Sequence, residues 1–373
     1  MRVLMTGGGT AGHINPALAI AADIRRRVPD AEFLFVGATG RMETELVPKA
    51  GYPLKTITVK GFSRRLTPAG IAHNVGAAWY ALAAGGACKK ILKEFQPDIA
   101  IGTGGYVCGP ILRTAAKMGI PVVVHESNAL PGVTVKMLAK YATAICLPTE
   151  ESKSRMPADS CPLAVTGNPL RAEFLSVDKA AARKALGVDD RPLVLSFGGS
   201  LGARRINEAM TDVLVQSAKS GRCQHIHGTG KNGYDEMMAA LAARGVTGKE
   251  DGLSIRPYID NIVDCMAAAD LVICRCGAMT ISELPACGAA SVLIPSPYVA
   301  ENHQFHNAMV LVNKGAAVCI EEKDLTGETL AATVEELLAD PDKLRRMGEA
   351  AREGAILDAS DRIWAIIESA LKK

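Results

Sequence analysis

Two stretches of the sequence share one plan: Val3-Leu4-Met5-Thr6-Gly7-Gly8-Gly9-Thr10-Ala11-Gly12 and Leu193-Val194-Leu195-Ser196-Phe197-Gly198-Gly199-Ser200-Leu201-Gly202-Ala203. Each begins with a short apolar run, continues into a glycine-rich loop and then enters a helical pattern. A buried strand that leads through such a loop into a helix opens a nucleotide-binding α/β domain. The repetition predicts two Rossmann-like domains in tandem.

Further apolar runs alternate with helical patterns along the chain. The additional strand candidates are Phe33–Val36, Ile99–Ile101, Val122–His125, Ala144–Leu147, Leu271–Ile273 and Val292–Ile294. Their uniformly apolar character is typical of parallel strands that are covered on both faces. The clearest helical patterns are Pro16–Arg27, Ile206–Lys219 and Asn302–Lys314. We therefore expect a doubly wound α/β architecture, with two such domains facing each other across a ligand-binding cleft.

The domain boundary is expected where regular structure breaks, at Thr166-Gly167-Asn168-Pro169. This divides the chain into an N-terminal domain over residues 1–165 and a C-terminal domain over residues 166–355. We expect residues 356–373 to form a helix that packs back on the N-terminal domain.

Composition narrows the class of protein. The chain carries 42 Lys and Arg against 39 Asp and Glu, and aromatic residues make up 4% of it, so we expect no nucleic-acid partner. Its ten cysteines include no C-x-x-C pair, which favours reduced thiols. No spacing of His, Cys, Asp and Glu resembles a metal site, and Asp340-Pro341-Asp342 is interpreted as a helix N-cap. We expect neither a metal nor a cofactor.

The first glycine loop matches the dinucleotide pattern as Gly7-x-Gly9-x-x-Gly12. We expect it to bind a phosphate or diphosphate at the start of a helix, with Asn15 as N-cap and Pro16 at the first position. NAD is disfavoured because Phe35-Val36-Gly37-Ala38 offers no acid for a ribose diol, and a merely structural turn stays open. His13 is either a general base or a helix-start residue.

Three further segments follow predicted strands. Thr103-Gly104-Gly105-Tyr106 is a second glycine loop, and His125-Glu126-Ser127-Asn128 is either an acid–base group or a polar strand end bonded to its own loop. Arg275–Glu283 continues from a strand into a helix, where Glu283 either grips a ribose or only complements the helix dipole. Pro285 is expected to kink or shorten that helix.

These segments together, in this order, resemble the MurG family, the N-acetylglucosaminyltransferases of peptidoglycan synthesis. The matching segments run over essentially the whole chain: Gly7–His13, Thr103–Tyr106, His125–Asn128, Gly167–Arg171, Gly198–Ala203, Cys274–Glu283 and Asn302–Gln304. The resemblance implies a GT-B fold and transfer of GlcNAc from UDP-GlcNAc to the C4 hydroxyl of the muramoyl sugar of lipid I. The implied products are lipid II and UDP, formed with inversion at the anomeric carbon.

The resemblance also implies site residues. It assigns UDP-GlcNAc binding to Thr10, Ala11, Gly12, Asn128, Arg171, Ser200, Ile259, Ala278, Met279, Thr280, Glu283 and Gln304. Arg171 and Ser200 are expected at the diphosphate, Ile259 at the uracil and Glu283 at the ribose. The acceptor's diphosphate is assigned to Gly8, Gly9, Thr103, Gly104, Gly105 and Tyr106.

The chemistry of the implied reaction fits these residue types. A leaving diphosphate is stabilised by Arg171 and by helix N-termini, and the attacking hydroxyl needs a base. His13 is the first choice for that base and Glu126 the second. The sequence departs from the commoner family pattern at Ala11, where glycine is frequent, at Cys276, where serine is frequent, and at Ser127, where glutamine is frequent.

A soluble enzyme that acts on lipid I must dock at a bilayer. Arg64, Arg65, Trp79, Tyr80, Lys89, Lys90 and Lys93 flank or lie in the apolar stretch Val75–Cys88, which at 14 residues is shorter than the ~20 that span a membrane. This pattern predicts peripheral docking on anionic phospholipids at the cytoplasmic face of the cell membrane, with other cell-wall synthesis proteins as partners. A core helix with a solvated basic end is the alternative.

Three other functions stay open. The first is a related GT-B transferase that acts on another lipid such as diacylglycerol. The second is an NAD-dependent oxidoreductase, and the third is a non-catalytic nucleotide-sugar binder. The missing ribose acid argues against the second, and the set His13, Glu126, Arg171 and Glu283 argues against the third.

Overall fold

The computed structural model describes residues 1–59, 84–199 and 201–372, and its chain divides into two compact units. Unit 1 comprises Met1–Pro169 together with Asp358–Lys373, and unit 2 comprises Leu170–Leu357. The predicted seam at Thr166–Pro169 therefore lies immediately before unit 2. The chain passes from one unit to the other twice, at Pro169–Leu170 and at Leu357–Asp358.

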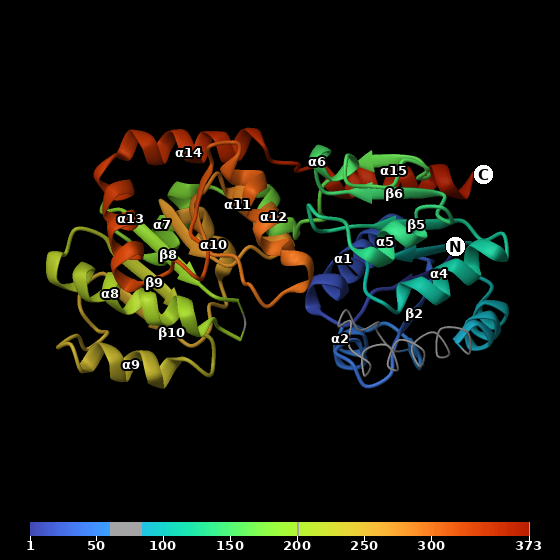
Figure 1. Ribbon diagram of the computed structural model, residues 1–373, viewed down its shortest axis with the longest axis horizontal. Helices are drawn as coiled ribbons and strands as arrows, with labels where there is room; N and C mark the ends of the chain where they lie inside the picture. Colours follow the sequence, from blue (N-terminus) through green and yellow to red (C-terminus); the bar gives the residue numbers. More distant parts are fainter. Residues whose placement is uncertain (60–83, 200, 373) are drawn as a thin grey trace. The chain divides into compact units, whose positions relative to one another are not determined.

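Unit 1 is built on a parallel sheet in the order β3-β2-β1-β4-β5-β6-β7 (Figure 1). Its strands are β1 (Arg2–Thr6), β2 (Glu32–Ala38), β3 (Leu54–Ile57), β4 (Ile99–Gly102), β5 (Val122–His125), β6 (Ala144–Leu147) and β7 (Leu163–Val165). Its helices are α1 (Ala11–Arg27), α2 (Glu43–Lys49), a helix over residues 84–95, α4 (Cys108–Lys117), α5 (Val133–Leu138), α6 (Glu150–Lys153) and α15 (Ala359–Leu371). The last of these, α15, packs on α1, β5 and β6 of this unit.

Unit 2 repeats the plan with a parallel sheet in the order β10-β9-β8-β11-β12-β13. Its strands are β8 (Leu193–Phe197), β9 (Gln224–Gly228), β10 (Leu253–Arg256), β11 (Leu271–Cys274), β12 (Ala290–Leu293) and β13 (Ala317–Cys319). Its helical elements are η1 (Ala172–Ser176), α7 (Lys179–Leu186), α8 (Arg204–Ser220), α9 (Tyr234–Ala242), α10 (Ile262–Ala268), α11 (Ala278–Cys287), η2 (Ala300–Asn302), α12 (His303–Val312), α13 (Gly327–Ala339) and α14 (Pro341–Glu353).

The predicted doubly wound α/β class is confirmed. In both sheets the strand order reverses beside the first strand, at β1–β4 and at β8–β11, as in a Rossmann-like domain. Each sheet is covered on both faces, because successive strand residues alternate between two buried apolar clusters. Leu4 and Val3, for example, belong to the clusters on opposite faces of unit 1.

Strand β9 escaped the sequence analysis because its sequence, Gln-His-Ile-His-Gly, is polar. Both histidines are nevertheless buried, and each has a hydroxyl partner in the core. His227 Nδ1 lies 2.7 Å from Ser196 Oγ on the neighbouring strand, and His225 Nε2 lies 2.8 Å from Ser217 Oγ on α8. These hydroxyl partners, which come from distant parts of the chain, allow the polar segment to be buried as a strand between β8 and β10. The strands β3, β7, β10 and β13 were also not predicted.

The predicted start of the first helix is wrong. Helix α1 begins at Ala11, with Thr10 as the N-cap residue, and Pro16 lies inside the helix rather than at its first position. The Thr10 carbonyl accepts hydrogen bonds from the N–H groups of His13 and Ile14, so the helix is under way before the proline. Asn15 is therefore not the cap, and His13 occupies the first turn.

The predicted helix cap at Asp340-Pro341 is confirmed. Asp340 is the N-cap of α14, its side chain accepts from the Lys343 N–H, and Pro341 stands at the first helical position. Pro285 lies inside α11, which ends at Cys287. A cap acts over a few positions, so the residues around Asp340 were sufficient to locate this one.

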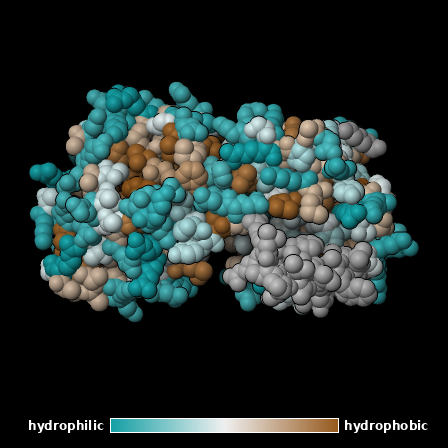
Figure 2. Space-filling model, viewed as in Figure 1, coloured by the Kyte–Doolittle hydropathy of each residue, from teal (hydrophilic) through white to brown (hydrophobic). Residues whose placement is uncertain are grey.

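On the face shown in Figure 2, hydrophobic residues form small groups separated by hydrophilic ones. Among the residues that the structure describes, no helix combines the length and the apolar character needed to cross a membrane.

Candidate active site

The predicted site residues of unit 1 come from three loops at one edge of its sheet. Strands β1, β4 and β5 are parallel neighbours, so their carboxyl ends lie at the same edge. Ligands of open α/β sheets bind at this edge, beside the reversal of strand order. Thr103 and Glu126 lie in the loops that leave β4 and β5, and His13 lies in the first turn of α1, just after the loop that leaves β1.

His13 is held by Thr103 at two points. Its ring Nδ1 lies 3.1 Å from the Thr103 carbonyl oxygen, and the Thr103 hydroxyl donates to the His13 carbonyl at 2.6 Å. Because a carbonyl oxygen only accepts, Nδ1 carries the proton in the neutral ring and the lone pair is on Nε2. A Cβ added at Gly104 would lie 2.6 Å from Nδ1, so the second glycine loop leaves room for the imidazole. The ring is thus fixed in the tautomer that a base acting through Nε2 requires.

Glu126 is buried, and backbone donors occupy both of its oxygens. Oε1 accepts from the N–H of Asn128 at 2.8 Å and from its side-chain Nδ2 at 3.2 Å, while Oε2 accepts from the Gly132 N–H at 2.8 Å. A carboxylate with three N–H donors is a loop-closing group that orients Asn128. The geometry favours His13 over Glu126 as the base.

His125 is a buried polar strand end that bonds to a distant loop, whereas Glu126 bonds to its own loop. Its Nε2 donates to the Gly167 carbonyl at 3.2 Å, and only 1% of its surface is exposed. Burial lowers the pKa of His125 to about 4, so the ring is neutral at pH 7. This histidine joins β5 to the loop before unit 2.

Sequence reasoning missed Glu43, the first residue of α2. Its carboxylate is fully buried and accepts from the N–H groups of Gly9 at 3.0 Å and Ala38 at 2.9 Å. In NAD-binding domains the acid that binds the ribose stands at the end of the second strand, and Glu43 lies five residues beyond β2. It contacts the glycine loop only because the start of α2 is buried against that loop. Nothing in the local sequence signals this contact.

Tyr106 lies beside the same loop. A Cβ added at Gly9 would approach its ring at 3.3 Å, and its hydroxyl is buried with no hydrogen-bond partner among the described residues. A buried hydroxyl without a partner is costly, which points to a ligand or a further chain segment as its partner. Thr103, in contrast, is fully buried, and its hydroxyl donates a hydrogen bond to the His13 carbonyl.

In unit 2 the predicted donor residues gather at the start of α11 and around it. Gly277 is the N-cap in extended backbone, and Ala278, Met279 and Thr280 form the half-buried first turn. The first N–H groups of a helix have no acceptor within the helix and favour an anion. Ile259 is 8% exposed and packs against Gly228, while Ser200 lies outside the described residues.

Glu283 and Arg171 face each other in this unit. Glu283 Oε1 lies 3.9 Å from Arg171 Nη2, and the carboxylate is 15% exposed. Burial raises the pKa of Glu283 above its ordinary value, and the charge of Arg171 opposes that shift. The Arg171 guanidinium also lies over the Phe174 ring at 5.0 Å. A carboxylate and a cation are therefore held side by side next to the start of α11.

Gln304 is oriented by the backbone around it. Its Oε1 accepts from the N–H groups of Ser296 at 2.9 Å and Cys276 at 3.3 Å, which leaves its Nε2 amide as the group that donates to a ligand. Cys276 itself is fully buried in the core, and burial raises the pKa of its thiol. The thiol that replaces the family's frequent serine is therefore a core group here.

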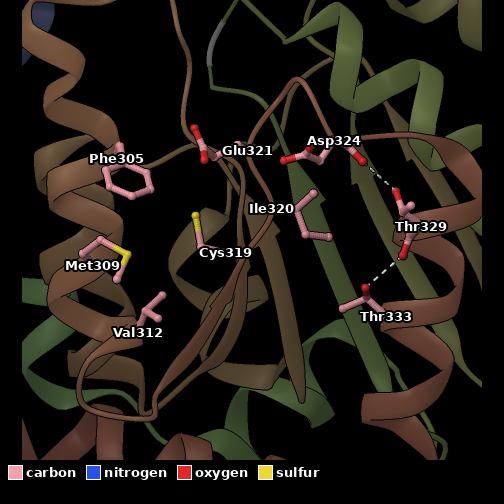
Figure 3. A pocket seen from close by; sticks show the side chains of 9 residues that line it. All are labelled: Phe305, Met309, Val312, Cys319, Ile320, Glu321, Asp324, Thr329 and Thr333. Carbon is pink, nitrogen blue, oxygen red and sulfur yellow. Dashed lines mark hydrogen bonds between the residues drawn. The ribbon is translucent and has the colours of Figure 1, made fainter.

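The pocket in Figure 3 lies between α12 and α13 beside the edge strand β13, with a cavity volume of about 490 Å³. Its lining residues are Phe305, Met309, Val312, Cys319, Ile320, Glu321, Asp324, Thr329 and Thr333. None of the predicted site residues lines it.

Family models match both units. The glycosyltransferase family 28 N-terminal domain matches residues 3–147, and the glycosyltransferase family 28 C-terminal domain matches residues 193–363. The chain belongs to glycosyltransferase family 28. An Acetivibrio thermocellus protein is 43% identical over the full chain and 99% of its own length. It is named UDP-N-acetylglucosamine--N-acetylmuramyl-(pentapeptide) pyrophosphoryl-undecaprenol N-acetylglucosamine transferase.

Two further comparisons agree. A Bacillus cereus protein with the same name, numbered 1, is 40% identical over 100% of both chains. The crystal structure of Acinetobacter baumannii MurG is 29% identical, covers 99% of each chain and gives a TM-score of 0.80. The resemblance to the MurG family and the two-domain GT-B fold that it implied are confirmed.

Proposed function

We propose that the chain transfers GlcNAc from UDP-GlcNAc to the C4 hydroxyl of the muramoyl sugar of lipid I, giving lipid II and UDP. The observation that carries this proposal is the 43% identity, over the full chain, to a transferase of that printed name. The two sites support it, because unit 1 offers an oriented base and unit 2 offers an anion-binding helix start beside a carboxylate.

The reaction is a displacement at the anomeric carbon. The acceptor oxygen attacks this carbon as the bond to the UDP oxygen breaks, so the configuration inverts. His13 Nε2 takes the proton of the attacking hydroxyl, and UDP leaves with the electron pair of the broken bond. Arg171 and the first turn of α11 stabilise the negative charge that develops on the diphosphate.

Two other side chains are oriented to bind the donor sugar. Asn128 is held by Glu126, and Gln304 is held by the backbone at Cys276 and Ser296. Side chains fixed in this way lose little freedom when they bind, so their hydrogen bonds discriminate between sugars. Both are suited to recognise the acetamido group and hydroxyls of GlcNAc.

The proposal is tested by incubating the protein with labelled UDP-GlcNAc and lipid I. We expect labelled lipid II to appear together with stoichiometric UDP. Labelled product with diacylglycerol but not with lipid I would favour the related lipid transferase. Tight UDP-GlcNAc binding without turnover would favour a non-catalytic binder.

Glu283→Ala is expected to raise the Kd for UDP about 5- to 150-fold, as a lost ribose contact costs about 1–3 kcal/mol. The contact is made before and during the reaction, so KM for UDP-GlcNAc rises more than kcat falls. Isothermal titration with UDP measures the effect, with exposed Glu173→Ala on η1 as the matched control. Unchanged affinity would make Glu283 only a helix-dipole acid.

We further propose that unit 1 docks on anionic bilayers. Arg64, Arg65, Trp79 and Tyr80 lie outside the described residues, as does most of Val75–Cys88. Lys89, Lys90 and Lys93 are exposed on the helix over 84–95, whose other face is buried in the core. This geometry fits the core-helix alternative for residues 84–88 and still presents the three lysines to solvent.

Helix α5 and Tyr141, three residues beyond its end, add an exposed apolar stripe to unit 1. Val133, Met137 and Tyr141 are 48%, 64% and 37% exposed, at a spacing of four residues. The Arg113 guanidinium lies over the Tyr141 ring at 5.2 Å, and Lys140 is exposed on the same segment. Apolar side chains among cations suit an anionic membrane surface.

Replacing Lys89, Lys90 and Lys93 together by glutamate is expected to weaken binding to phosphatidylglycerol vesicles at least about tenfold at low salt, since each charge near the surface contributes about 1 kcal/mol. Vesicle co-sedimentation measures it. A triple variant at Lys219, Lys231 and Lys249, exposed in unit 2, changes the net charge equally and is the control. Equal pelleting of all three proteins would contradict docking through these lysines.

A further inference from the structure

We propose that Glu43 is a positioning residue of the transferase site. Its carboxylate holds the first glycine loop and accepts the hydrogen bond of the Gly9 N–H, the donor that a phosphate would otherwise use. The loop then places Thr10 and His13 at the start of α1, while the Gly9 amide is closed to the acceptor's diphosphate. The effect on turnover rests on the proposed function, whereas the hold on the loop does not.

The carboxylate of Glu43 is built into the loop. Its Oε2 accepts from the Gly9 N–H at 3.0 Å and its Oε1 from the Ala38 N–H at 2.9 Å, with no exposed surface. One side chain thereby ties the loop after β1 to the end of β2. A buried carboxylate needs such donors, because an unpaired one is costly.

Glycines make the space that this carboxylate fills. A Cβ at Gly8 would lie 2.3 Å from Glu43 Oε1, and a Cβ at Gly37 would lie 2.5 Å from Glu43 Cγ. With contacts this close, a side chain at either position would require Glu43 to move. The backbone on both sides of Glu43 is thus shaped around a residue of the protein itself.

The hydrogen bond from Gly9 to Glu43 also affects the position of His13, because the residues between Gly9 and His13 form the start of α1. Gly9 has φ of +86°, which glycine adopts readily, and it leads directly into Thr10. The Thr10 carbonyl accepts from the His13 N–H at 3.1 Å, so the place of Thr10 decides where the first turn forms. Fixing the Gly9 amide therefore fixes the position of the histidine.

The same contact decides which ligands the loop accepts. A phosphate that approached the Gly9 N–H would meet a carboxylate already bound there, and the two groups carry the same sign of charge. The Gly8 N–H points to the Gly104 carbonyl, at 3.4 Å. Thr10 and Gly12 at the helix start are exposed and do not share this restriction.

The test compares Glu43→Ala, Glu43→Gln and the control Glu45→Ala, an exposed position on the same helix. We expect Glu43→Ala to lower kcat about 10²-fold, as a misplaced catalytic group does, with KM for UDP-GlcNAc within about twofold. Formate, a carboxylate small enough to replace the lost group between the two N–H donors, is expected to restore kcat about tenfold.

Glu43→Gln fills the space but sets its NH₂ group against one backbone N–H. We expect it to lower kcat with KM for UDP-GlcNAc unchanged, and formate should have no effect on it. Should the alanine variant fail to fold, this split between kcat and KM carries the test. Full activity of the Gln variant, or a loss in the Ala variant that formate leaves unchanged, would overturn the proposal.

Hydrogen exchange separates this inference from the proposed function. Amides of residues 7–13 are expected to exchange about tenfold faster in Glu43→Ala and to be protected again by formate. This result requires no turnover, so it holds if wild-type protein makes no lipid II. Unchanged exchange of these amides would overturn the role of Glu43 in holding the loop.

Discussion

Alanine in place of His13 is expected to lower kcat about 10²- to 10⁴-fold, the usual contribution of a general base, while the Kd for UDP stays within about twofold. The imidazole carries its proton on Nδ1 because that atom faces the Thr103 carbonyl at 3.1 Å. Nε2 therefore has the lone pair that removes the acceptor's proton. The residues that we propose for uridine binding, Ile259 and Glu283, lie in unit 2, so we expect UDP affinity not to depend on this ring.

Steady-state kinetics with lipid I and titration with UDP measure the two quantities. Asn15→Ala is the matched control, since Asn15 is exposed on the same helix and does not cap it. Activity close to wild type is expected for this control. If Glu126→Gln loses far more activity than His13→Ala, the carboxylate is the base and the assignment to His13 is wrong.

Unit 2 is expected to lose about 4 kcal/mol of stability between pH 7 and pH 5 from two buried histidines, about 2 kcal/mol from each. Burial lowers the pKa of His225 to about 3 and that of His227 to about 4. In the unfolded chain both titrate near their ordinary 6.5. Between these values the unfolded state binds more protons, so this stability is fully present above pH 6.5 and is lost as the pH falls toward 4.

The core around these rings explains the shift. The Nδ1 atom of His225 and the Nε2 atom of His227 are buried with no hydrogen-bond partner among the described residues. A second proton on either ring would add a buried charge whose N–H has no acceptor. Neutral rings are therefore the only forms that this core accommodates.

Hydrogen exchange of the β8 and β9 amides at the two pH values measures the effect. In the double variant His225→Asn/His227→Asn, the loss of stability between pH 7 and pH 5 should shrink by about 4 kcal/mol. The partly exposed His303→Asn is the control and should leave the difference unchanged. An equal pH dependence in wild type and double variant would contradict the argument.

The sequence by itself determined the class of fold and the family. Uniform apolar runs such as Val122–His125 and Leu193–Phe197 require burial on both faces, which specifies parallel strands. Glycine loops and the Asp340-Pro341 cap depend on a few neighbouring residues, so local rules located them. The order of motifs along the chain was sufficient to identify the family.

Only the tertiary structure decided how the site is assembled. Glu43 bonds to Gly9, 34 residues away, and Thr103 bonds to His13, 90 residues away. It also decided that β9 is a strand, since its histidines find hydroxyl partners on β8 and α8. For Glu43 and Thr103 the reason is that parallel strands bring the ends of distant segments to one edge, where a polar side chain takes the donor or acceptor that lies across from it. For β9 the partners lie on the neighbouring strand and on a helix of the same unit. Local patterns fix where a strand ends, but strand order in the sheet fixes which groups meet there.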